Sequence, residues 1–97
     1  MTIYGITHRR LAVNGAIAAI RCQVVDGNRN LVGPAQQFTA LQAADLIDGG
    51  EAFELWPRVG AARVFGGAVQ VRREPDGTPR LVEERAGGRQ LLDLPGF

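Results

Sequence analysis

Hydrophobic and polar residues alternate along the first quarter of the chain, as they do in strands with one buried and one wet face. Residues 2–13 are rich in strand-forming side chains, and residues 16–25 alternate apolar positions with Arg21 and Gln23. Asn14-Gly15 stands between the two segments and is a strong signal for a two-residue hairpin turn. The pattern therefore predicts a β-hairpin, followed by a loop of turn residues at 26–30.

Helical spacing replaces the alternation at residues 38–50, FTALQAADLIDGG. Thr39 can act as the N-cap, and Gln42 stands three residues later, as in a capping box. Gly49 and Gly50 can end the helix. The apolar side chains form one face of four residues flanked by two leucines: Ala40, Ala43, Ala44 and Ile47, with Leu41 and Leu46. The alanines predict a short helix packed closely on a sheet.

The remaining segments are extended and broken by turns. Gly33-Pro34 predicts an irregular stretch before the helix. After the helix we expect strands at 52–56, 68–74 and 80–85, with a turn at 75–78 and a break at 86–89. Residues 58–67 predict a long loop or a distorted hairpin, with 63–65 as an extra strand. The apolar residues of the tail 90–97 are expected to bury over one end of the core, because four exposed large side chains would be sticky.

These elements predict an α+β fold. Its antiparallel sheet would have about five strands in the order β-β-α-β-β-β, with one short helix packed on one face. The 97 residues suffice for one modest core, so we expect a small single domain spanning residues 1–97.

Composition narrows the classes of function. The 11 basic and 10 acidic residues leave a net charge of +1, so no general attraction to nucleic acid or anionic membrane is expected. Cys22 is the only cysteine and His8 the only histidine, which excludes a disulfide framework and paired-histidine sites. No motif indicates a metal or cofactor. No apolar run reaches a membrane span, and the first residues lack a signal-peptide layout. We therefore expect a cytoplasmic bacterial or phage protein.

Candidate catalytic residues are few. His8 needs an orienting partner, and Thr7 should point to the opposite strand face, so a half-exposed strand histidine is the favoured interpretation. Cys22 lies among apolar strand positions and resembles a small buried hydrophobe. Glu83 and Glu84 diverge on a strand, which makes a poor acid–base pair unless one meets a carboxylate from elsewhere. The sequence therefore predicts no enzymatic activity.

Two arginine pairs fall on predicted strands, Arg9-Arg10 and Arg72-Arg73, while Arg21, Arg58 and Arg63 lie elsewhere. One arginine of each pair could share an exposed sheet face, with Tyr4 or Trp56 as a stacking surface for nucleic acid. Cross-strand pairing with glutamates on the same strands explains the pattern without a ligand and is the favoured interpretation. Trp56 precedes a proline at a strand end. Exposed, it would anchor a partner; buried, it would belong to the core.

The order of short motifs resembles a family of small bacterial domains of unknown function. The matching pieces are a Tyr-x-Ile-Thr start, a threonine-capped helix ending in Ile-x-x-Gly, a strand that starts near a phenylalanine, a Val-x-Val strand and a Leu-Leu-x-Leu-Pro close. In this chain they are Tyr4 to Thr7, Thr39 to Gly50, Phe53, Val69 to Val71, and Leu91 to Pro95. The segment Leu81 to Glu84 departs from the family, where an aromatic-rich Tyr-Leu-Arg-Thr piece is expected. The resemblance implies a stand-alone bacterial domain and carries no activity or functional residue.

The leading hypothesis for function is a small non-enzymatic protein-interaction module. It would bind a protein partner or form a homo-oligomer through a sheet edge or the sheet face opposite the helix. The alternative is a nucleic-acid-binding domain with an arginine-bearing sheet face. The candidate interaction residues are Trp56, Arg9, Arg10, Arg72 and Arg73.

Overall fold

The computed structural model describes residues 1–83 and 91–97. Its first two strands, β1 (Ile3–Leu11) and β2 (Ile17–Val25), pair antiparallel. The turn between them has Gly15 at φ +84°, and the Asn14 side chain accepts a hydrogen bond of 3.0 Å from the Ala16 amide. Positive φ is strained for most residues and free for glycine. The predicted first hairpin is therefore confirmed.

A third strand, β3 (Leu31–Thr39), pairs antiparallel with β2 where the sequence predicted an irregular stretch. That prediction was wrong. Gly33 adopts φ +75°, and the register with β2 shifts between Cys22 and Val24. Pro34, which has no N–H to donate, is tolerated because β3 lies at the edge of the sheet. The two breaker residues thus distort the strand without ending it.

The helix α1 (Ala40–Asp48) follows β3 directly. Thr39 accepts from the Gln42 amide at 3.1 Å, and the Gln42 side chain accepts from the Thr39 amide at 2.9 Å, so the predicted capping box is present. Ala43 and Ala44 are fully buried, as expected. Leu41, in contrast, is 57% exposed. Ala43 and Ala44, at the centre of the predicted apolar face, therefore pack in the core, whereas Leu41 at its flank stays in solvent.

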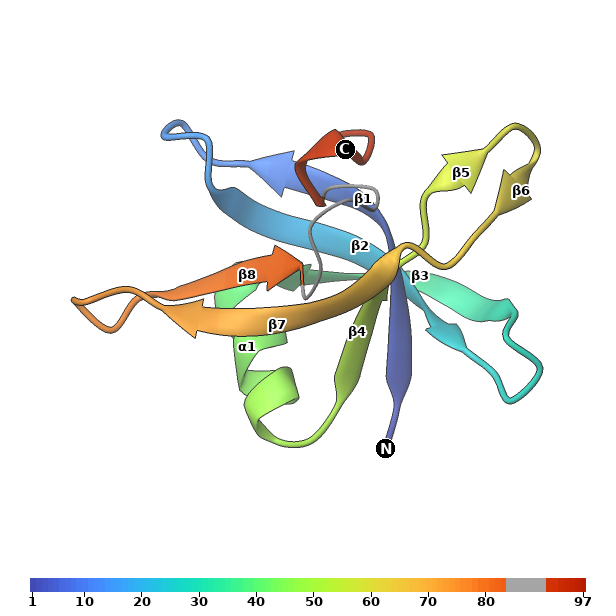
Figure 1. Ribbon diagram of the computed structural model, residues 1–97, viewed down its shortest axis with the longest axis horizontal. Helices are drawn as coiled ribbons and strands as arrows, with labels where there is room; N and C mark the ends of the chain where they lie inside the picture. The colour runs from blue at the N-terminus through green and yellow to red at the C-terminus, as the bar shows by residue number, and fades with distance from the viewer. Residues whose placement is uncertain (84–90) are drawn as a thin grey trace.

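The second half of the chain contains a sheet hairpin and a small separate hairpin. The strands are β4 (Ala52–Leu55), β5 (Arg58–Val59), β6 (Ala62–Arg63), β7 (Gly67–Arg73) and β8 (Pro79–Glu83). β7 pairs antiparallel with both β4 and β8, and β5 pairs only with β6 among the described residues. Within the stretch 58–67, predicted as a long loop or a distorted hairpin, residues 58–63 form the β5–β6 hairpin, an arm that stands out from the sheet in Figure 1. The extra strand predicted at 63–65 ends at Arg63.

The main sheet has six strands in the order β3-β2-β1-β4-β7-β8. It is mixed, because β1 and β4 run parallel. The prediction of an antiparallel sheet of about five strands is corrected on both points, while the α+β class is confirmed. The parallel pair arises because the chain crosses over through α1 before returning beside β1. The strand that the sequence did not predict is β3.

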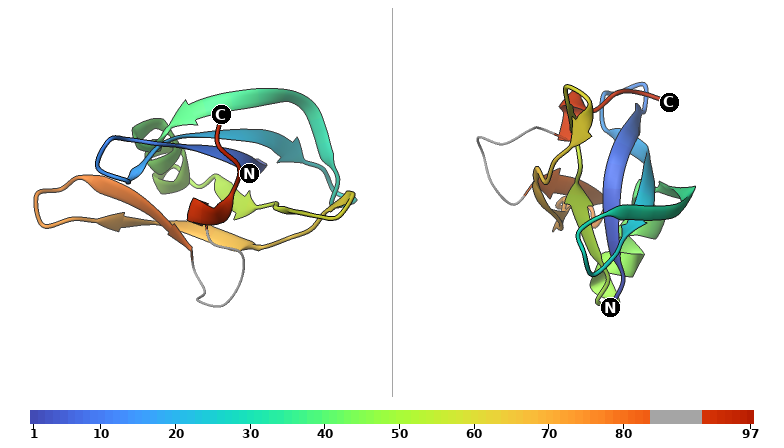
Figure 2. Two further views of the ribbon diagram at one scale, coloured as in Figure 1. Left: turned by 90° about the horizontal axis from the view of Figure 1, so that it is seen from above. Right: turned by 90° about the vertical axis from the view of Figure 1, so that its right-hand side faces the viewer.

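The sheet curls around its core. α1 contacts β8 and β3, which are the two edge strands, as well as β7 and β2. A short 3-10 helix, η1 (Leu91–Asp93), lies at the other end of the curl, above the sheet in Figure 1 where α1 lies below it. Figure 2 shows the layer of β1 to β3 facing the layer of β7 and β8 across this core. The helix and the tail therefore close opposite ends of a half-barrel.

The tail packs over one end of the core as the sequence predicted, except that Leu92 is 51% exposed. Leu91 is 4% and Leu94 2% exposed, and both belong to the same core as Ile6, Ile20 and Phe53. The tail also pairs with β1: the Arg9 amide donates to the Pro95 carbonyl at 3.0 Å, and Gly96 forms a parallel bridge with Arg9. The predicted extension of the last strand through Glu84 to Arg85, the break at 86–89 and Gln90 lie outside the described residues. No helix among the described residues has the length and apolarity to cross a membrane.

Candidate anion-binding surface

A β-bulge in β1 places two neighbouring side chains together. Ile6 pairs with Cys22 and His8 pairs with Arg21, so Thr7 is an extra residue without a partner in β2. The Thr7 hydroxyl lies 2.8 Å from His8 Nδ1 and 3.3 Å from the Arg21 carbonyl oxygen. The prediction that Thr7 and His8 diverge was wrong, because the bulge interrupts the alternation of side chains.

The same bulge fixes the ring of His8. The Thr7 hydroxyl has one proton, and when it donates this proton to the Arg21 carbonyl it can only accept from His8. Nδ1 of His8 then carries the proton of that second hydrogen bond. Nε2 is then the ring nitrogen left for a ligand. Thr7 is 5% exposed, whereas His8 is half-buried. Thr7 is therefore the positioning residue, and His8 is the group that reaches the surface.

Two arginines meet at the base of the β5–β6 arm. Arg58 and Arg63 are direct cross-strand partners. Like charges directly opposite each other destabilise a strand pair. Arg63 also donates to the Trp56 carbonyl at 3.0 Å, which holds its side chain at the root of the arm. Burial, and then the charge of Arg58, lower the pKa of Arg63.

These two pairs, His8 with Arg21 and Arg58 with Arg63, form one positive surface. The Trp56 amide donates to the Ile6 carbonyl at 2.9 Å, which ties the root of the arm to the start of the bulge. Burial lowers the pKa of His8, and Arg63, Arg21 and Arg58 lower it further. We call these four residues the arginine–histidine cluster.

No carboxylate balances this cluster within residues 1–83 and 91–97. The ion pairs in these ranges are Arg29 with Glu54 at 3.2 Å, Arg80 with Glu74 at 3.1 Å, and Arg73 with Asp48. Arg72 and Arg80 also face each other across β7 and β8, but Glu74 compensates that pair. The cluster is different because its charges meet without an acidic neighbour in the described part of the chain, an arrangement that an anion would stabilise.

The structure separates the arginine pairs named by the sequence. Arg9 Nε donates to the Leu92 carbonyl and Arg10 Nε to the Phe97 carbonyl, each at 3.1 Å. The guanidinium groups of Arg10 and Arg21 both lie 4.5 Å from the centroid of the Phe97 ring. Arg9 and Arg10 therefore hold the tail.

The second predicted pair lies on the other hairpin. Arg73 is bound to Asp48 of the helix, and Arg72 is exposed on β7, two strands away from β1. The four arginines Arg9, Arg10, Arg72 and Arg73 do not converge on one platform.

The two aromatic residues proposed for stacking are enclosed. Trp56 is 6% exposed, so the buried one of its two alternatives is observed. Its indole N–H donates to Glu54 at 3.3 Å, and its ring packs over Gly5, where an added Cβ would come within 2.8 Å of the indole. Tyr4 stacks on Phe53 with ring centroids 4.8 Å apart. Both rings therefore pack within the protein, Trp56 in full and Tyr4 in part.

Cys22 is a core residue, as its pattern indicated. It is fully buried, and burial raises the pKa of its thiol to about 12. A thiol in this state is a poor nucleophile at neutral pH. Among the described residues, no three His, Cys, Asp or Glu side chains are placed to hold a metal ion.

Sequence reasoning missed the role of Arg58 and Arg63. The sequence did contain a signal for this hairpin. Gly60-Ala61, between Val59 and Ala62, is a two-residue loop with glycine in the first position, and in the structure Gly60 has φ +63°. That signal predicts a hairpin with the two arginines opposite each other. The bulge at Thr7 has no comparable local signal.

Comparison of the chain with protein-family models, curated proteins and solved structures finds no match. The resemblance to small bacterial domains stays a prediction, and function is argued from the geometry.

Proposed function

We propose that the protein is a non-enzymatic binding module that binds nucleic acid by its phosphate backbone, through the arginine–histidine cluster. The observation that carries this proposal is the joining of the cross-strand pairs His8–Arg21 and Arg58–Arg63 by the Trp56–Ile6 backbone hydrogen bond, without an acidic partner among the described residues. The charges of Arg63, Arg21 and Arg58 all act on His8. Arginine forks match phosphate oxygens well, and a protonated histidine adds a further donor.

The β5–β6 arm supports a polymeric ligand over a small anion. The arm projects from the sheet (Figure 1), and β-ribbons of this kind can lie along a nucleic-acid groove or strand. Val59 is 49% and Phe65 51% exposed on or just beyond the arm. These side chains give the ligand apolar contact next to the charges.

The absence of catalysis is part of the proposal. Among the described residues, the hydrogen-bond partner of His8 is a threonine, and the charged groups that shift its pKa are arginines. A general base would need a carboxylate or a similar group to stabilise its protonated form. We place the protein in the cytoplasm, where nucleic acid is the abundant polyanion. The sequence-based proposal of a protein partner or homo-oligomer is retained for a separate surface.

The test is binding of fluorescently labelled 20-mer oligonucleotides, single- and double-stranded, measured by anisotropy over a series of salt concentrations. The double variant Arg58→Ala/Arg63→Ala is expected to bind about tenfold more weakly, since each lost charge-assisted contact is worth roughly 1 kcal/mol or more. The slope of log affinity against log salt should fall by about one per lost phosphate contact.

Arg72→Ala is the matched control, because Arg72 is an exposed strand arginine outside the cluster. Its affinity should stay within about twofold of the wild type. Equal losses in the control and the double variant would favour the platform predicted from sequence. No binding of any oligonucleotide at low salt would refute the proposal.

A further inference from the structure

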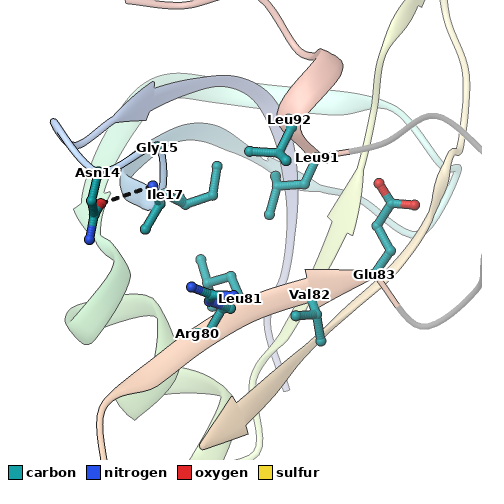
Figure 3. Close-up of a pocket in the computed structure, with 10 residues that line it drawn as sticks. Asn14, Gly15, Ile17, Arg80, Leu81, Val82, Glu83, Leu91 and Leu92 are labelled. Carbon is teal, nitrogen blue, oxygen red and sulfur yellow. Dashed lines mark hydrogen bonds between the residues drawn. The ribbon is translucent and has the colours of Figure 1, made fainter. Parts of the chain in front are cut away.

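A groove of about 290 Å³ runs beside β8, away from the arginine–histidine cluster. It is lined by the β1–β2 turn with the start of β2, by β8, and by η1. Figure 3 shows Ile17, Leu81, Leu91 and Leu92 around the central space, with Asn14 and Arg80 at one end and Glu83 at the other. The walls of this groove are therefore apolar and its ends are polar.

The groove lies along the outer edge of β8. Arg80, Leu81, Val82 and Glu83 all line it, although successive side chains of a strand point to opposite faces. Four consecutive residues can border one space only where the strand is met from its edge. β8 is the last strand of the sheet, and among the described residues its ladder is made with β7 alone. Its outer backbone groups are thus available to another strand.

Glu83 marks one end of the groove with an unbalanced charge. Both carboxylate oxygens are buried, and within the described residues neither makes a hydrogen bond of ordinary geometry. Burial raises the pKa of this carboxyl, the backbone amide of Leu91 opposes the shift, and the charge of Asp93 adds to it. A buried carboxylate without a partner is costly, and a cation placed beside it removes much of that cost.

A second copy of the chain does not supply that cation by symmetric pairing of β8 with itself. A two-fold axis through Leu81 sets Arg80 opposite Val82 and Glu83 opposite Pro79 of the other copy. In every other two-fold antiparallel register, odd-numbered residues face odd-numbered residues of the other copy, and even-numbered residues face even-numbered ones. Arg80 therefore never faces Glu83 directly. The occupant of the groove must bring its own basic residue.

We propose that the groove binds an extended segment of a partner protein, which adds a strand to the outer edge of β8. An apolar side chain of this segment packs against Ile17, Leu81 and Leu91, and a lysine or arginine of the segment pairs with Glu83. Strand addition of this type takes its affinity from main-chain hydrogen bonds and its specificity from pockets for alternate side chains. This site is independent of the proposed nucleic-acid surface, with which it shares no residue.

The experiment is selection of a random heptapeptide library displayed on phage against the immobilised full-length protein. The strongest peptide is then synthesised and titrated by calorimetry. We expect enrichment of peptides with an apolar residue and a basic residue, and a gain of hydrogen-exchange protection at the amides of β8 in the complex. Glu83→Gln should weaken binding of the basic peptide at least tenfold. A peptide with the basic residue replaced by alanine should bind Glu83→Gln and wild type alike.

Leu92→Asp tests the groove without disturbing the core, because Leu92 is 51% exposed. It should reduce peptide binding tenfold, whereas Leu41→Asp, at a similarly exposed leucine on α1, should leave it unchanged. Arg58→Ala/Arg63→Ala should bind the peptide normally. The proposal is overturned if no peptide is enriched, if the enriched peptides lack a basic residue, or if their affinity ignores both Glu83→Gln and Leu92→Asp.

Discussion

The arginine–histidine cluster and the β8 groove place unbalanced charge in opposite settings. In the cluster, four cationic or protonatable side chains share a surface that is partly open to water. In the groove, one carboxylate with buried oxygens lies at the end of walls formed by leucine and isoleucine. Solvent and salt screen the first arrangement more strongly than the second. The cluster should therefore bind its ligand fast and with strong dependence on salt. The groove should release its partner slowly and discriminate strongly between partners.

The difference also concerns how each region is built. The cluster depends on local geometry, namely one bulge and one tight hairpin. The groove depends on the tail, because Leu91 forms part of its wall and also part of the core. Loss of tail packing should therefore damage the groove first. In the cluster it removes the Phe97 ring from Arg21 and leaves His8, Arg58 and Arg63 in place.

The largest expected effect comes from the tail. Leu94→Ala removes a side chain that is 2% exposed, and the free energy of unfolding should fall by about 3 kcal/mol. Urea denaturation followed by Trp56 fluorescence measures this loss. Leu92→Ala, at an exposed position of the same segment, should change stability by less than about 0.5 kcal/mol. Equal effects of the two variants would mean that the tail is not anchored in the core.

Reversing one charge of the arm should separate stability from binding. Arg58→Glu replaces a like-charge cross-strand pair by an attractive one, so stability should rise by roughly 0.5 kcal/mol. Oligonucleotide binding should fall more than tenfold, because a carboxylate then faces the phosphates. Thermal melting and anisotropy are the two measurements. Arg58→Gln should bind at an intermediate level, and a variant that loses stability would show that Arg58 is held by a contact other than its charge.

Acid should strengthen the cluster as a binding surface. The pKa of His8 lies below its ordinary 6.5 in the free protein, and bound phosphate favours the protonated ring. Affinity for an oligonucleotide should therefore rise as pH falls below about 6.5. In the free protein the sign is the reverse: the unfolded chain binds the proton more readily, so acidification lowers stability in the same range. His8→Gln should abolish the added affinity at low pH. A flat profile in the wild type would place His8 outside the contact.

The smallest effect is expected at Glu83 in the absence of partner. Its pKa is raised above 4.5, so the folded protein binds more protons than the unfolded chain just above that pH. Stability should therefore decline gradually as pH rises from 4.5 through the raised pKa. Glu83→Gln should flatten that decline and melt at a higher temperature near neutral pH. Glu74→Gln, at the partly exposed partner of Arg80, is the control, and the same flattening there would remove the assignment to Glu83.

Local signals predicted the elements that depend on neighbours in sequence. Asn14-Gly15 defined the first hairpin, and Thr39 with Gln42 defined the start of the helix, because the hydrogen bonds concerned span two or three residues. The burial of Cys22 followed from strand alternation. The apolar tail likewise predicted its own burial, which Leu91 and Leu94 confirm.

Long-range pairing escaped sequence reasoning. β3 is stabilised by its ladder with β2 despite Gly33-Pro34, and the parallel pair of β1 with β4 depends on the crossover between them. The predicted arginine platform was wrong for the same reason. Arg9 and Arg10 are committed to the tail by contacts with residues far away in sequence, which no local pattern reveals. The bulge at Thr7 changes the face of every side chain beyond it, and alternation alone predicts the opposite.

The pairing of Arg9 with Gly96 sets an order for events during synthesis. A ribosome releases β1 early and β2 pairs with one of its edges, yet the other edge of its outer half meets a neighbour only when the residues around Gly96 emerge. The Arg10–Phe97 hydrogen bond spans 87 positions. Contacts of this range close late and slow folding. A nascent chain would therefore carry an open strand edge until the residues around Gly96 arrive, and the arginines of β1 reduce the risk that another chain pairs there first.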